Sequence, residues 1–120
     1  MNNEGLGIDI VEINRIESLY TESFVKRILS VDELKLYDKM TNNKRKLEFL
    51  AGRFAAKEAY VKAYQHIDGA LNFNEVSILN DAYGAPYLSA PLSNDQVLIS
   101  ISHSDQYAVA VCSLKRGVKE

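Results

Sequence analysis

The chain has 120 residues, which suits one domain with a single modest core. A hydrophobic content of 47% is typical of a globular protein, and a net charge of −2 argues against general nucleic-acid binding. The single cysteine, Cys112, excludes an internal disulfide and a cysteine-rich zinc site, and its apolar surroundings indicate a buried, inert thiol. We see no signal peptide and no apolar run of ~20 residues, so we expect a cytoplasmic protein without a membrane span.

The first predicted element is a strand over residues 5–13, where β-branched residues follow glycines. Period-two alternation puts Asp9 and Val11 on one face and Ile8, Ile10 and Glu12 on the other. Both faces are partly apolar, so each acid interrupts an otherwise buried strand.

Short helical pieces are expected next. An apolar stripe predicts a helix over 13–20, and a turn follows at 24–29. Ser30 and Glu33 have the spacing of a capping box, which predicts a helix that ends at the polar residues 41–43.

The second half of the chain combines one long helix with strands. The helix is predicted over about 44–66 and is ended by Asp68 and Gly69. A strand over 71–80, a turn over 81–86 and a short strand at 87–88 follow, and two strands at 96–103 and 106–114 flank a tight turn. One strand, then helices, then an antiparallel strand meander predict an α+β fold in a single domain over 1–120.

Residues 49–63 form the most informative segment, a helix that is apolar or small nearly all the way round and yet carries four charges. Arg53 and Lys57 share one face, and Glu58 and Lys62 share another. A third face holds only small residues, so another backbone could pack closely against it. Two interpretations stay open here: a core helix with i,i+4 salt bridges, or a helix that holds a metal or a phosphate.

Four motifs in order resemble the holo-acyl-carrier-protein synthase family, the small phosphopantetheinyl transferases. They are GIDIVEI at 7–13, FLAGRFAAKEA at 49–59, GAP at 84–86 and ISISHS at 99–104. The resemblance implies transfer of 4′-phosphopantetheine from coenzyme A to a serine of apo acyl carrier protein, with adenosine 3′,5′-bisphosphate as the other product. It also implies a homotrimer with active sites between subunits.

The resemblance assigns Asp9 and Glu58 to a Mg²⁺ site that the coenzyme pyrophosphate completes. Two carboxylates from distant segments suit this cation, which shares its shell with water and phosphates. From the residues alone, Asp9 could instead cap the next helix and Glu58 could pair with Lys62. Glu12 matches a further family acid with a structural or supporting role.

Four basic side chains are candidates for the coenzyme phosphates, and phosphoryl transfer depends mainly on positioning and charge neutralisation. Lys62 could also stabilise the leaving phosphate, and Glu58 could act as the base, with Asp9 less free for that task. A lone histidine such as His103 is more often structural, but between two serines it looks like an anion-binding turn. The predicted coenzyme-binding residues are Arg53, Lys57, Lys62, His103, Ser104 and Pro86, and the predicted catalytic residues are Glu58, Lys62 and Asp9.

Arg15, Lys26 and Arg27 form a possible dock for the acidic carrier protein, because matching family positions are basic. The alternative is an ordinary solvated helix face.

The segment 64–70 departs from the family pattern, which has a glycine-rich loop after the Lys-Ala pair. Only Gly69 remains of that glycine content, so coenzyme or subunit contacts could differ. This departure leaves one rival function open, a carrier-binding homologue with weakened catalysis. A second rival, another metal-dependent nucleotide-binding enzyme, would have the same inventory of acids and bases.

Overall fold

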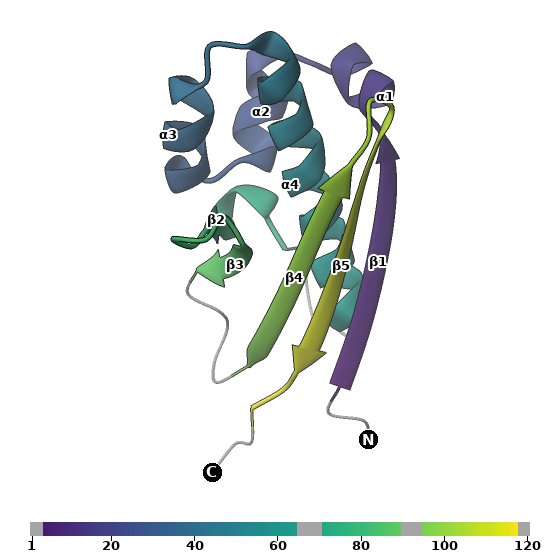
Figure 1. Ribbon diagram of the computed structural model, residues 1–120. Helices are drawn as coiled ribbons and strands as arrows, with labels where there is room; N and C mark the ends of the chain where they lie inside the picture. Colours follow the sequence, from purple (N-terminus) through teal and green to yellow (C-terminus); the bar gives the residue numbers. More distant parts are fainter. Residues whose placement is uncertain (1–3, 65–70, 90–94, 118–120) are drawn as a thin grey trace.

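The computed structural model describes residues 4–64, 71–89 and 95–117 (Figure 1). A three-stranded antiparallel sheet in the order β1-β5-β4 packs against the long helix α4, and a two-stranded sheet, β2-β3, lies beside β4. The three shorter helices gather toward one end of the molecule. The predicted α+β class is confirmed.

Strand β1 (Glu4–Glu12) is the predicted N-terminal strand, and it pairs along its full length with β5 (Tyr107–Lys115). Its inner face lies so close to α4 that a Cβ atom at Gly7 would sit 1.9 Å from the carbonyl oxygen of Ala59. A Cβ at Gly5 would sit 1.8 Å from that of Ala63. The predicted close approach of a second backbone to the small face of the long helix is therefore confirmed, and β1 is that backbone.

Helices α1 (Ile13–Ser18) and α3 (Val31–Lys39) match the predicted helices, and the capping box of Ser30 and Glu33 is formed in full. The predicted turn at 24–29 is wrong, because this segment belongs to helix α2 (Glu22–Ile28). Thr21 caps that helix by accepting a hydrogen bond from the backbone N–H of Phe24, 3.0 Å away.

Helix α4 (Asn43–Tyr64) is the predicted long helix. The predicted stop at Asp68 and Gly69, and most of the 64–70 departure, lie outside the described residues.

The predicted strand over 71–80 is only partly correct. Phe73–Glu75 form a 3-10 helix, and the strand β2 covers only Ser77–Asn80. β2 pairs with β3 (Pro86–Ser89), while β4 (Gln96–His103) pairs with β5, so the C-terminal strands form two hairpins in separate sheets rather than one continuous meander.

The core fills the space between α4 and the main sheet and continues under α1–α3. Cys112 is buried in it, and burial raises the pKa of its thiol to about 11, as expected of an inert cysteine. Within the described ranges, no helix is both long and apolar enough to cross a membrane.

The outer face of the main sheet carries exposed apolar side chains, although both faces of β1 were expected to be buried. Leu6, Ile8 and Ile10 of β1 are 68%, 63% and 64% exposed, and Leu98 of β4 is 73% exposed. Because Ile8 lies opposite Val111 of β5, these side chains share one face. We call this set, with Val111, the apolar sheet face.

Candidate active site

The first cluster of predicted site residues lies where β1 crosses α4. Lys62 Nζ donates to Asp9 Oδ1 and to the carbonyl oxygen of Ile8, each at 3.1 Å. The glycines of β1 bring the strand backbone against α4, which makes these short contacts possible. Asp9 is mid-strand, opposite Ala110, so it does not cap the following helix.

Glu58 completes this cluster from α4. Burial raises the pKa of its carboxyl above the ordinary value, the negative charge of Asp9 raises it further, and Lys62 opposes both effects. Among the ion pairs of the described residues, Lys62 pairs with Asp9 rather than with Glu58. The cluster therefore holds two acids that repel each other and one lysine.

This pair of acids fits a small, hard divalent cation. Burial is the main cause of the raised pKa of Glu58, and a cation would relieve the repulsion by Asp9 that adds to it. Within 4–64, 71–89 and 95–117, no group of three or more His, Cys, Asp or Glu side chains gathers in one place. Two carboxylates suit Mg²⁺, which commonly takes one or two carboxylates and leaves the other positions to water and substrate phosphates.

A second group of predicted residues lines a cavity of about 280 Å³ between α4, β4 and the β2-β3 hairpin. Arg53, Pro86 and His103 meet there, although they come from three different segments of the chain. Arg45 adds another positive charge to the wall. A concave site with convergent cations suits an anionic ligand.

Arg53 is held firmly on the wall of this cavity. It is buried, its Nε donates to the carbonyl oxygen of Ile78 at 3.0 Å, and its NH2 donates to Asn80 Oδ1 at 3.2 Å. Burial lowers the pKa of its guanidinium, and the charge of Glu33 opposes this. Arginine stays protonated in proteins, so a fixed positive charge remains here.

His103 and Ser104 occupy the end of β4 and the following turn. Nδ1 of His103 lies 3.2 Å from Glu48 Oε2. Ser104 Oγ accepts hydrogen bonds from the backbone N–H groups of Gln106 and Tyr107, at 3.3 and 3.2 Å, so it stabilises the turn and keeps its own hydroxyl hydrogen for another partner.

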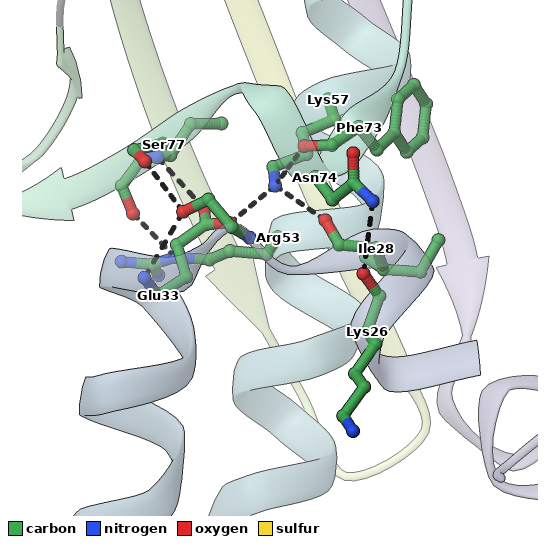
Figure 2. A network of polar contacts seen from close by, with 10 residues as sticks. Lys26, Ile28, Glu33, Arg53, Lys57, Phe73, Asn74 and Ser77 are labelled. Carbon is green, nitrogen blue, oxygen red and sulfur yellow. Dashed lines mark hydrogen bonds and ion pairs between the residues drawn. The ribbon is translucent and has the colours of Figure 1, made fainter. Parts of the chain in front are cut away.

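Lys57 does not lie in either cluster. Its Nζ donates to the carbonyl oxygens of Ile28 and Phe73, at 2.6 and 2.8 Å, and to Glu33 (Figure 2). Both charged side chains are fully buried. Because an ammonium has three donors and all three are used, Lys57 has none left for a phosphate, and its predicted coenzyme contact disagrees with the structure.

Arg15, Lys26 and Arg27 are exposed on α1 and α2, as a docking surface requires. Lys26 pairs with Glu22 at 3.1 Å, which reduces its free charge. Arg27 lines a small cavity of about 200 Å³ beside the 3-10 helix.

Arg45 and Glu48 line the cavity, although neither was predicted as a site residue. With Phe49 and Gly52, which also line the cavity, they follow the i, i+3, i+4, i+7 spacing of one helix face. That periodicity, combined with the predicted role of Arg53, could have identified Arg45 and Glu48 from the sequence.

Known proteins with similar sequences identify the family to which this chain belongs. The profile of the 4′-phosphopantetheinyl transferase superfamily matches residues 5–112. The holo-[acyl-carrier-protein] synthase of Oceanobacillus iheyensis is 47% identical over 109 residues, which cover 88% of this chain and 91% of the relative. The chain belongs to the holo-[acyl-carrier-protein] synthase family. Another family member, from Anoxybacillus flavithermus, is 44% identical over 93% of this chain and 95% of its own.

Solved structures of holo-[acyl-carrier-protein] synthases share the fold. The Bacillus anthracis enzyme, in complex with CoA (3′,5′-ADP), has a TM-score of 0.85 and 41% identity over 94% of this chain and 96% of its own. The Helicobacter pylori enzyme, in complex with coenzyme A, has a TM-score of 0.76 and 35% identity over 92% of this chain and 99% of its own.

Proposed function

We propose that this chain transfers 4′-phosphopantetheine from coenzyme A to a serine of apo acyl carrier protein and releases adenosine 3′,5′-bisphosphate. The observation that carries the proposal is the pairing of Asp9 and Glu58 beside Lys62, in a member of this family whose relatives bind coenzyme A. A buried free thiol agrees with a reducing, cytoplasmic location.

The reaction forms a bond from the serine oxygen to phosphorus and breaks the phosphorus–oxygen bond that leads to the adenosine bisphosphate. Glu58 accepts the serine proton, directly or through a water molecule. Lys62, whose side chain is 54% exposed, stabilises charge on the departing phosphate. Mg²⁺ held by Asp9 and Glu58 would supply positive charge to the pyrophosphate oxygens.

The coenzyme phosphates bind at the cavity of Arg53, Pro86 and His103, and Ser104 follows His103 in the chain. Arg53 suits phosphate because its charge is fixed in position before the ligand arrives. Lys57 has no direct contact with the ligand in this proposal.

We propose that the active site is shared between subunits of a homotrimer. In one chain, Lys62 and Arg53 are nine residues apart on α4, which places them on opposite sides of the helix, and Glu58 and Arg45 are separated by about 20 Å along its axis. A neighbouring subunit can bring the two clusters together. The apolar sheet face offers a surface for such a contact.

Product release tests the function. Apo carrier protein, coenzyme A, Mg²⁺ and this chain should yield adenosine 3′,5′-bisphosphate, and a carrier with its acceptor serine replaced by alanine should yield none. Release that does not depend on the carrier serine would indicate hydrolysis and would contradict transfer.

Mixing two impaired variants tests the shared site. If Asp9 and His103 serve one site from different subunits, Asp9→Ala and His103→Ala chains that are unfolded and refolded together should recover activity above the mean of the two alone. If the mixed chains form trimers, as confirmed by sedimentation, but recover no activity, each active site lies within one subunit.

A further inference from the structure

Glu48 is an acid in a place where the proposed ligand is an anion. It lines the same cavity as Arg45 and Arg53, and its side chain is only 12% exposed. A carboxylate there repels phosphate, so a site built for an anion gains nothing from Glu48 by direct contact. Any contribution of Glu48 to ligand binding must therefore pass through a neighbouring side chain.

His103 is that neighbour. Glu48 Oε2 lies 3.2 Å from His103 Nδ1, and the histidine side chain is 44% exposed. A carboxylate at this distance contacts the ring at Nδ1 and restrains its orientation. The other nitrogen, Nε2, is then left for a ligand in the cavity.

The protonation of the ring decides what Nε2 can do. A neutral ring that donates Nδ1–H to Glu48 presents a bare Nε2, which cannot donate to a phosphate. A ring that carries a second proton donates from both nitrogens, to Glu48 and to the ligand.

The remaining charged groups around the ring do not take over the role of Glu48. Arg45 and Arg53 are cations and have no acceptor for Nδ1–H. Asp105, in the adjacent turn, pairs with Lys44 at 3.1 Å. Among the acids of the described residues, Glu48 is the one that forms an ion pair with His103.

We propose that Glu48 is a positioning residue, which holds His103 so that its Nε2–H binds a coenzyme A phosphate. This inference rests on the proposed function, because it assumes that coenzyme A occupies the cavity. Glu48 then contributes to coenzyme affinity indirectly, by supporting the hydrogen bond from His103 to the phosphate. A hydrogen bond to a charged group usually changes affinity by a factor of roughly ten or more.

A double-mutant cycle tests the proposal by calorimetric titration with coenzyme A. Glu48→Ala and His103→Ala should each weaken binding by roughly tenfold, and the double variant should be no weaker than His103→Ala alone. Glu48→Gln, which keeps an acceptor for Nδ1–H, should recover part of the loss. Circular dichroism and thermal melts confirm that each variant is folded.

Asp105→Ala provides a matched control, since it removes an acid from the adjacent turn whose ion-pair partner is Lys44 rather than His103. It should leave coenzyme affinity unchanged or slightly raised, whereas Glu48→Ala lowers it. Additive losses in the cycle, or equal effects of Glu48→Ala and Asp105→Ala, would overturn the positioning role while leaving the proposed function intact. A wild-type chain that does not bind coenzyme A would overturn both.

Discussion

Lys62 Nζ lies 3.1 Å from Asp9 Oδ1, although 53 residues separate the two side chains along the sequence. The contact joins the middle of β1 to the last turn of α4, and Glu58 lies near enough to interact with both charges. This is the point at which strand, helix and proposed chemistry meet.

Asp9→Ala and Glu58→Ala should each reduce transfer strongly while leaving the fold intact. Each removes a carboxylate from a cluster that has only two, and loss of a general base alone commonly costs about 10²–10⁴-fold in rate. Turnover at limiting Mg²⁺, with circular dichroism as the fold control, checks this. Near-normal turnover of either variant would remove the metal assignment.

Glu58 should make stability depend on pH. Its pKa is raised in the folded state, so the folded state holds its proton more tightly than the unfolded state does. The free energy of unfolding therefore falls as pH rises from the ordinary value of 4.5 through the folded pKa.

Glu58→Gln, in the absence of divalent metal, should melt at a higher temperature than wild type at pH 7, and the difference should shrink toward pH 4.5. Thermal melts across this range measure it, with Glu17→Gln on the exposed surface of α1 as the control. A difference that stays constant with pH would show that Glu58 titrates alike in both states.

Lys57→Met should destabilise the protein by about 3–5 kcal/mol, because it leaves the buried carboxylate of Glu33 without its partner. Urea unfolding measures this. Lys62→Met, at a half-exposed ion pair, should cost no more than about 1 kcal/mol but should impair transfer.

The folded fraction of Lys57→Met should bind coenzyme A nearly as well as wild type, since Lys57 has no free donor. Affinity that falls tenfold or more in a variant shown to be folded would restore Lys57 to the coenzyme site.

Arg15→Glu and Arg27→Glu should raise the KM for carrier protein more than the KM for coenzyme A. Both side chains are exposed, and the proposed partner is acidic. Lys26→Glu should have a smaller effect, because Glu22 already offsets its charge. Added salt should narrow the gap between wild type and variants. An equal rise in both KM values would place the dock elsewhere.

Local patterns were the most reliable guide to this fold. The capping box of Ser30 and Glu33 spans four residues, and it forms as predicted. The small face of the long helix also predicted a close backbone neighbour, because Ala59 and Ala63 leave no bulk to prevent it. Helix α2 was missed because its seven residues show little periodicity and the cap at Thr21 was overlooked.

Longer-range relationships could not be read from spacing. Lys57 and Arg53 were placed together because they are four residues apart on one helix face. In the structure Lys57 bonds to Glu33 and to the Ile28 carbonyl, 24 and 29 residues away, whereas Arg53 reaches Ile78. Which charged residue enters the core depends on how α2, α3 and β2 pack, and no local pattern contains that information.

Intact-mass spectrometry of the carrier protein tests the central claim most directly. After incubation with this chain, coenzyme A and Mg²⁺, apo carrier protein should gain the mass of one phosphopantetheine group, and a carrier whose acceptor serine is alanine should not. Carrier that binds the chain but keeps its original mass would contradict the account and would favour a homologue with lost catalysis.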